Sequence, residues 1–268
     1  TNLTVGSAAP SGVMFGETDA IGGDAVQVVN NDAIDRTASI ANNMSTDVAN
    51  IAGRGIFIQS SGTGMLTVDF SGNDLKSTDH ALEVSENAGV ATANTVDLSI
   101  DSNRWETGTG VPAVEIVGQN INANTSTINV NSLNANTIVA NGTGGGMLFN
   151  SVTFDAVKGG AIQQVLATGT TEIGQNAGGP AAANQRVQGD GLALLNTAGN
   201  LHINVLNIAN NNGTGLEIDT SGAGTTFNFN TGVQNIDTTN GTPPPPPPPP
   251  PPRGTGNDYF AAPVADPN

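Results

Sequence analysis

The sequence has no cysteine, and its charged residues are scarce and mostly acidic. Lys and Arg total 7 against 23 Asp and Glu in 268 residues, for a formal net charge of −16. Without cysteine there is no disulfide framework and no thiolate metal site. With so few basic side chains, we expect neither a nucleic-acid partner nor attraction to anionic membrane surfaces, because both require neutralisation of phosphates.

Long apolar runs are also missing. No segment approaches the roughly 18 to 20 consecutive apolar residues that a membrane-spanning helix needs, so the sequence predicts no transmembrane segment. The chain begins with Thr1 rather than Met, from which we expect a processed or excerpted chain. The absence of cysteine is compatible with export, and we predict a secreted or cell-surface location.

Small and turn-forming residues are present in excess, with 35 Gly, 34 Asn and 30 Thr among 268 positions. These residues disfavour helices, because Gly loses backbone entropy there and Asn and Thr offer the backbone competing hydrogen bonds. The apolar residues instead alternate with polar ones, as in a strand with one buried face. We therefore predict an all-β chain of short strands separated by polar turns.

Two interleaved repeats indicate the architecture. In the first repeat, a small residue is followed by an apolar residue, then any residue, then a second apolar residue. In the second repeat, a short strand ends on an apolar residue at positions 40, 70, 100, 130, 154, 205 and 229. The steps between successive copies are shorter than a propeller blade and too constant for a sandwich. They predict a solenoid of about eight coils, about 38 Å long. The first series places its leading apolar residue at Val26, Ile56, Leu82, Val114, Ile138, Ile162, Leu192 and Leu216.

Asparagine recurs at the predicted corner after the second strand. Asn43, Asn73 and Asn103 are equally spaced, and Asn134 and Asn210 fall near the same place in later repeats. Asn tolerates left-handed backbone and hydrogen-bonds to neighbouring backbone groups, which suits a sharp corner. We predict that these five side chains stack into an amide ladder.

The segment from Asn210 to Ile218 combines a corner Asn, a Gly-rich stretch and the strand Leu216-Glu217-Ile218. This pattern, which covers about residues 13–240, resembles the right-handed parallel β-helix repeat of pectin-lyase-like proteins. Variants of that solenoid rich in Asn build autotransporter passengers and other bacterial surface adhesins. The resemblance implies a right-handed parallel β-helix in an extracellular surface protein.

The chain divides into three predicted parts. The β-helix is expected over 1–242, with 1–24 as its first coil or edge and 174–188 as a loop excursion that lacks alternation. The ten prolines at 243–252 predict a polyproline II linker, because their rings fix φ. This tract looks like the proline-rich segment near the end of some autotransporter passengers. The tail at 253–268 is too short and polar to fold alone.

Candidate chemistry is sparse. Carbohydrate-cleaving β-helices use calcium with acidic and basic side chains, or clustered aspartates, whereas the basic residues here are scattered and no Asp-Asp or Gly-His-Gly run occurs. Glu83 and Glu115 are predicted to stack as like charges, either solvated or bound to a cation such as calcium. We expect no other cofactor. The lone Trp105 is the only candidate platform for a sugar.

Three functions follow, in order of preference. The first is a non-catalytic adhesin or autotransporter-like passenger rod that binds host or matrix carbohydrate or protein. The second is a structural subunit of an extracellular filament, sheath or layer, whose like subunits stack end to end, because neither end of the repeat shows a cap. The third is a polysaccharide lyase or hydrolase.

Overall fold

A computed structural model describes residues 2–6, 12–16, 19–86, 96–119, 127–140, 144–157, 161–174, 189–209, 213–219, 226–237 and 259–260. Within these ranges every regular element is a strand except the 3₁₀ helix η1 (Val48–Asn50). The all-β prediction is therefore confirmed. Asn210, the polyproline tract, the loop at 175–188 and the tail apart from Tyr259–Phe260 lie outside the described residues.

The smaller of two sheets has eight strands in the order β2-β4-β7-β10-β13-β16-β18-β20. The first seven are parallel, and β20 joins β18 in antiparallel pairing. Their bounds are β2 (Val26–Asn30), β4 (Ile56–Ser60), β7 (Leu82–Glu86), β10 (Val114–Val117), β13 (Met147–Asn150), β16 (Leu192–Leu195), β18 (Leu216–Asp219) and β20 (Tyr259–Phe260).

The larger sheet has twelve parallel strands in the order β1-β3-β5-β8-β11-β14-β17-β15-β12-β9-β6, with β19 also paired to β17. Their bounds are β1 (Asn2–Val5), β3 (Arg36–Ala41), β5 (Leu66–Ser71), β6 (Asp74–Ser77), β8 (Val96–Asp101), β9 (Arg104–Thr107), β11 (Ile128–Asn134), β12 (Thr137–Ala140), β14 (Val152–Phe154), β15 (Val165–Ile173), β17 (Ala198–Ala209) and β19 (Phe227–Asp237).

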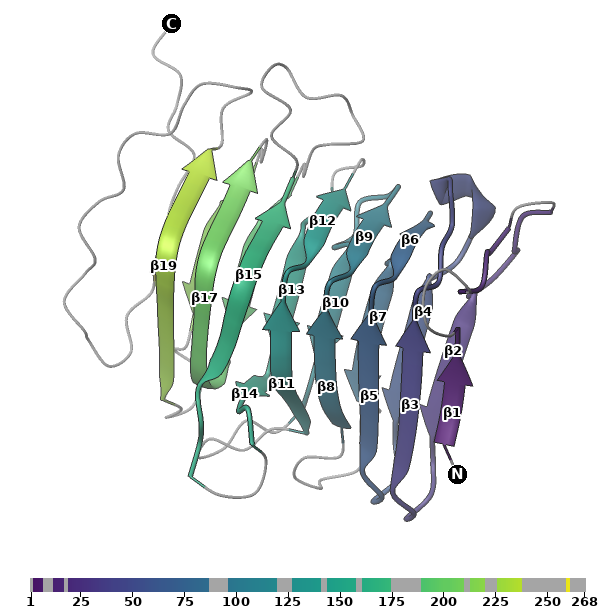
Figure 1. Cartoon of the computed structure of the whole chain (residues 1–268), viewed down its shortest axis with the longest axis horizontal. Helices are drawn as coiled ribbons and strands as arrows, with labels where there is room; N and C mark the ends of the chain where they lie inside the picture. Colours follow the sequence, from purple (N-terminus) through teal and green to yellow (C-terminus); the bar gives the residue numbers. More distant parts are fainter. Residues whose placement is uncertain are drawn as a thin grey trace, which may run out of the picture.

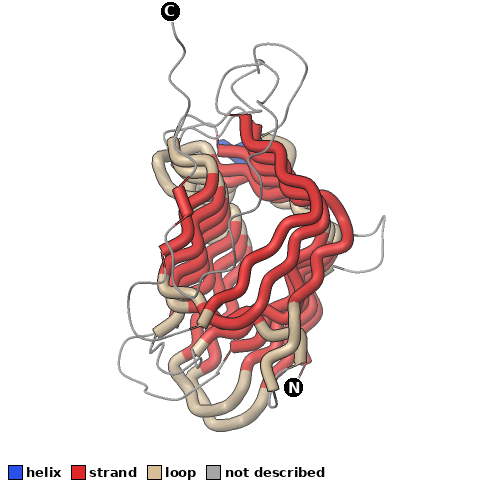
Figure 2. The backbone as a smooth tube through the Cα atoms, turned by 90° about the vertical axis from the view of Figure 1, so that its left-hand side faces the viewer, coloured by secondary structure: helices blue, strands red, loops and turns tan. Residues whose placement is uncertain are grey.

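Successive passages of the chain lie side by side in both sheets. Val26 pairs with Ile56, and Ile56 pairs with Leu82, so neighbouring strands are one repeat apart in sequence. Figure 1 shows the strands following one another from β1 to β19 along the long axis. Seen from the end, the passages superimpose around one interior (Figure 2). This arrangement is compatible with a parallel β-helix-like solenoid.

Alternation within each strand builds the core. In β5, Leu66, Val68 and Phe70 are buried while the residues between them face outward, because successive side chains of a strand point to opposite faces. Parallel pairing stacks each inward residue on its equivalent in the next passage. One such column crosses the whole larger sheet through Leu3, Ala38, Val68, Leu98, Val130, Phe154, Gly199 and Phe227.

The predicted first series is wrong at two positions. Ile138 belongs to β12 of the larger sheet, and Ile162 lies in no strand. The residue between Val114 and Leu192 in the smaller sheet is Met147. Met147 also follows a glycine, but its distance from Val114 along the chain exceeds every step in the predicted series.

Asn43, Asn73 and Asn103 form one buried ladder at the corner between strands. Asn43 Nδ2 donates a hydrogen bond of 2.9 Å to Asn73 Oδ1, and Asn73 Nδ2 donates one of 2.8 Å to Asn103 Oδ1. The residue before each ladder position has a positive φ: 57° at Asn42, 65° at Gly72 and 59° at Ser102. The left-handed residue turns the chain, and the Asn side chain satisfies the backbone at the turn.

The fourth member of the ladder is Asn136, not the expected Asn134. Asn103 Nδ2 donates to Asn136 Oδ1 over 3.2 Å, whereas Asn134 pairs in register with Asp101 and accepts from the Gly169 amide. The cause is a longer passage between β8 and β11, which already places Ile128 opposite Val96 and Val130 opposite Leu98, together with a further one-residue shift between Val130 and Ser132. Leu133, rather than Val130, therefore lies opposite Ile100.

The ladder ends where the strands become long. In the passage after Asn136, the corner position is occupied by Thr171, because Thr137 pairs with Glu172. In the following passage it is occupied by Leu206. At Asn73, Asn103 and Asn136 the larger sheet is split into two strands per passage, as in β5 and β6. Where Thr or Leu occupies it, one strand such as β15 or β17 runs straight through. The corner Asn therefore marks a break between strands.

Replacing Asn73 with alanine tests the ladder. The substitution leaves the Ile40 carbonyl and the amide of Asn43 without the Asn73 side chain that each contacts. Because each buried group left unpaired costs about 1–3 kcal/mol, we expect the free energy of unfolding to fall by about 2–4 kcal/mol in urea titrations. Asn235→Ala is the matched control, since Asn235 is exposed and its side chain donates to Asn207 on the surface of the sheet. Equal, small losses in both variants would contradict a stabilising role for the ladder.

Candidate functional site

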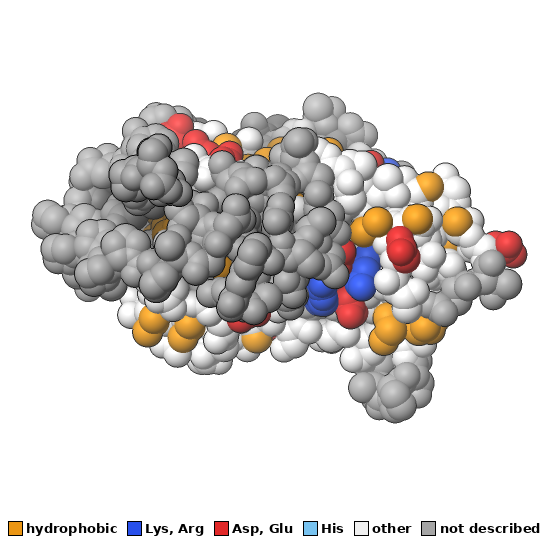
Figure 3. Space-filling model, turned by 90° about the horizontal axis from the view of Figure 1, so that it is seen from above, with side chains coloured by type: hydrophobic (Ala, Val, Ile, Leu, Met, Phe, Trp, Pro, Cys, Tyr) orange, Lys and Arg blue, Asp and Glu red, His pale blue; other side chains and the backbone are white. Residues whose placement is uncertain are grey.

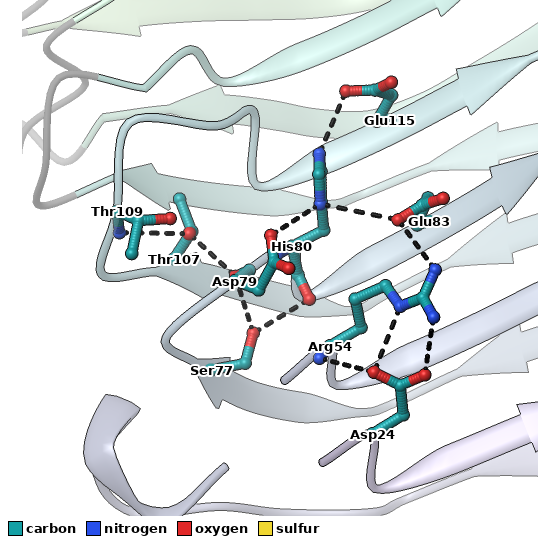
Figure 4. A network of polar contacts seen from close by, with 9 residues as sticks. All are labelled: Asp24, Arg54, Ser77, Asp79, His80, Glu83, Thr107, Thr109 and Glu115. Atoms are coloured by element: carbon teal, nitrogen blue, oxygen red, sulfur yellow. Dashed lines mark hydrogen bonds and ion pairs between the residues drawn. The ribbon is translucent and has the colours of Figure 1, made fainter. Parts of the chain in front are cut away.

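Ionic side chains from four successive passages meet on the outer face of the smaller sheet (Figure 4). Glu83 of β7 and Glu115 of β10 are paired neighbours, at the adjacent positions that the sequence analysis expects. Both face outward, because Leu82, Val84, Val114 and Ile116 on either side of them are buried. Two carboxylates on adjacent parallel strands repel unless a cation lies close by.

Arg54 supplies one cation. Its Nε and Nη2 donate to the two carboxylate oxygens of Asp24 over 3.0 and 2.7 Å, and its Nη1 donates to Glu83 Oε2 over 3.1 Å. The guanidinium also lies 3.5 Å from the centre of the Phe57 ring. The hydrogen bonds from Arg54 lower the pKa of Asp24 below its usual value. Arg54 thus ties three consecutive passages together.

His80 is the second basic side chain of the site, and it contacts both glutamates. Its Nε2 lies 2.9 Å from Glu115 Oε2, while its Nδ1 lies 2.9 Å from Asp79 Oδ1 and 3.6 Å from Glu83 Oε2. Burial alone would lower the pKa of His80, but the hydrogen bond to Glu115 and the charges of Glu115, Asp79 and Glu83 outweigh it and raise the pKa. When it is protonated, the ring relieves the repulsion between the two glutamates.

The turn that carries His80 is held by neutral hydrogen bonds. Ser77 Oγ lies 2.9 Å from each of the carbonyl oxygens of Asp79 and His80 and donates to both. Thr107 Oγ1, from the next passage, donates to the Asp79 carbonyl over 2.8 Å. The imidazole is therefore positioned by β6 and β9 as well as by its own turn.

The arrangement is typical of a structural ionic network. Each of Glu83 and Glu115 contacts a cationic side chain of the same chain. Across the described ranges, no three His, Asp or Glu side chains are grouped so as to hold a metal ion. The network joins passages of the chain that are one repeat apart in sequence.

A second ionic cluster lies on the larger sheet. Arg104 pairs in register with Asp74, as the repeat predicts, and its Nη2 lies 3.0 Å from Glu106 Oε2. Lys76 Nζ lies 3.9 Å from the same oxygen. The Glu106 side chain is only 5% exposed, so the two cations offset the charge of a nearly buried carboxylate.

Trp105 does not form a surface platform. Its side chain is fully buried, and its ring meets Phe70 edge-on with centroids 6.2 Å apart. The expectation that it contacts a sugar is therefore corrected. Arg104 and Glu106 take the outward positions of β9, so alternation turns Trp105 into the core. The alternation of charged, apolar and charged residues was the sequence signal for this burial.

Sequence reasoning missed the contributions of Asp24, Arg54 and His80. Asp24 and Arg54 are separated by the same interval as the corner Asn residues, so the register could have paired them. His80 occupies a turn rather than a strand. It contacts Glu115, 35 residues further along the chain, whereas the corner Asn residues are 30 residues apart. No periodic signal identifies such a turn residue.

Comparisons assign no family to the chain. No protein-family model, no curated protein sequence and no solved structure matches it. Among the described residues, no helix is long and apolar enough to cross a membrane. The function must therefore be argued from the residues themselves.

Replacing His80 with glutamine tests the network through pH. Because the pKa of His80 is raised, its contribution to stability is present below the ordinary histidine pKa near 6.5 and is lost as pH rises through the raised value. Between pH 6 and pH 9, we expect the wild-type unfolding temperature to fall by about 2 °C more than that of His80→Gln. His202→Gln, on β17 of the larger sheet, is the control and should follow the wild type. Identical pH profiles for His80→Gln and the wild type would contradict the assignment.

Proposed function

We propose that the chain is a non-catalytic extracellular surface protein, an adhesin or autotransporter-like passenger rod. In this proposal a right-handed parallel β-helix of about eight coils forms the rod, and the polyproline tract at 243–252 is a stiff linker beyond it. The parallel sheets and the core column from Leu3 to Phe227 support this architecture. A rod of this kind presents the same outward positions repeatedly along its length.

The observation that carries the proposal is an exposed amide array on β17 and β19. Asn228 Nδ2 donates to Asn200 Oδ1 over 2.6 Å, and Asn235 Nδ2 donates to Asn207 Oδ1 over 2.8 Å. Asn228 and Asn235 are exposed, so their remaining polar atoms face solvent. These amides recur at the spacing between strands, about 4.8 Å, so they can hydrogen-bond to successive units of a repeating polymer.

Charge narrows the choice of partner. A net charge of −16 disfavours the binding of acidic glycans, because like charges repel. An uncharged host or matrix polysaccharide fits the amide array better, because its hydroxyl groups both donate and accept hydrogen bonds. The proposed location is secreted or at the cell surface.

Two other functions rank below this one. A structural filament subunit is supported by the terminal strands β1 and β19, each of which has a strand partner on one side only within the described ranges. A polysaccharide lyase or hydrolase ranks third, because Glu83 and Glu115 are both engaged with cations of the chain itself.

Co-sedimentation with insoluble neutral polysaccharides, such as cellulose and chitin, tests the proposal. We expect the wild type to sediment with at least one of them, and Asn200→Ala/Asn228→Ala to bind about fivefold more weakly, since two polar contacts are removed. Gln27→Ala/Gln59→Ala, on the smaller sheet, is the matched control and should bind like the wild type.

Two outcomes would count against this function. Equal binding by both double variants would remove the amide array from the contact. Release of sugar products from polygalacturonate with calcium would replace the non-catalytic function with an enzymatic one.

A further inference from the structure

The two ends of the solenoid carry open strand edges. Within the described ranges, β1 pairs only with β3 and β2 pairs only with β4 at one end, while β19 pairs only with β17 at the other. Figure 1 shows β1 and β19 at opposite ends of the long axis. A sheet edge of this kind is a template for a further strand.

Apolar side chains gather at the end that carries β1 and β2. Six of the nine exposed large hydrophobic residues in the described part lie there, and hydrophobic side chains cluster on that end in Figure 3. Leu3 is 43% exposed although it occupies a core-facing position. The six residues are Leu3, Val13, Met14, Val29, Ile34 and Met44.

The opposite end also presents core residues that are incompletely covered. Phe227, Phe229 and Ile236 of β19 pack against the core but remain only partly buried. Phe227 stacks beside Phe154 with ring centroids 5.7 Å apart. Phe227 also stacks on Phe229, with ring centroids 6.3 Å apart, and part of its surface remains exposed.

The register matches the two ends to each other. Leu3 and Phe227 are the first and last members of one unbroken column of inward residues. A second copy placed with its β1 beside β19 would continue this column, with Leu3 on Phe227, in the same parallel pairing that joins all twelve strands of the sheet. The occupant that satisfies both ends at once is therefore another copy of this chain.

One edge already holds an added strand. In the smaller sheet, β20 pairs antiparallel with β18, with Ile218 opposite Tyr259 and Glu217 opposite Phe260. It is the only antiparallel strand pair in the described part. The strand comes from the tail beyond the polyproline tract. A copy with its β1 beside β19 would have its β2 two strand positions beyond β18, because the larger sheet has one more level from β1 to β19 than the smaller sheet has from β2 to β18. The strand β20 fills the position between them.

We propose that the β1–β2 end of one copy docks on the β19 end of a second copy, with Leu3 against Phe227, and that β20 fills the position between β18 of one copy and β2 of the next. This inference rests on the filament alternative above. The contact is heterologous, so it builds an open chain of subunits rather than a closed dimer.

Cysteine cross-linking tests the docking, because the natural chain has no cysteine. Within one molecule, Leu3 and Phe227 are seven strand spacings apart, about 34 Å, far beyond the roughly 4.4–6.8 Å between Cα atoms that a disulfide spans. Mixing Leu3→Cys with Phe227→Cys under mild oxidation should therefore give a covalent heterodimer, and Leu3→Cys/Phe227→Cys should give a ladder of oligomers.

Val233→Cys is the control for Leu3→Cys mixing, since exposed Val233 also lies on β19 but pairs with Val205 in another column. Circular dichroism would verify that each variant is folded. A heterodimer yield with Phe227→Cys no higher than with Val233→Cys would overturn the docking.

Proline substitution tests the role of β20. Tyr259→Pro/Phe260→Pro removes the backbone donors of β20, so the cross-linking yield should fall several-fold, whereas Gly254→Pro/Thr255→Pro should leave it unchanged. Equal yields from the two proline variants would overturn the role of β20. Absence of cross-links with intact polysaccharide binding would overturn the interface alone, whereas cross-links without polysaccharide binding would support it and leave the filament as the function.

Discussion

Parallel register between successive passages is the constraint on which the rest of this molecule depends. Once Val26 is paired with Ile56, the same alignment brings Asp24 to Arg54 and Asn43 to Asn73. A slip of one residue would exchange the inward and outward faces of a strand. One alignment therefore produces the hydrophobic columns, the buried amide ladder and the surface ion pairs. A slipped register would lose all three sets of contacts and would be less stable.

The irregularity in β11 shows how closely these features are coupled. A one-residue shift between Val130 and Ser132 moves the core partner of Ile100 from residue 132 to Leu133 and moves the corner from residue 135 to Asn136. Both changes have the same direction and come from the same inserted residue. The sequence predicts the strands on either side, because their alternation is local. It does not predict the shift, because pairing between distant strands decides where an extra residue is absorbed.

The candidate site shows the same division between local and distant information. The adjacency of Glu83 and Glu115 follows from their equivalent places in the repeat, and the alternation in β9 is sufficient to bury Trp105. The position of His80 depends on the path of a turn, which Ser77 and Thr107 fix from two other strands. Turn paths vary with loop length, and the loops here make the repeat shorter in some passages and longer in others. Periodicity therefore recovers strands and stacked residues but not turn residues that reach across passages.

Stacking that satisfies the middle of a solenoid leaves its ends unsatisfied. In the described part of the chain, β1 and β19 each have a strand partner on one edge only, so exposed strand edges and exposed core residues occur together at the two ends. The acidic surface opposes association at those ends, since like charges repel at distances up to the Debye length of about 8 Å at physiological salt. Near β18, burial and the charges of Asp190 and Asp219 raise the pKa of Glu217, so negative charge is already crowded at that edge. A short strand from the same chain pairs with β18 without bringing the charge of a second molecule, so β20 extends the smaller sheet by one position at a crowded acidic edge.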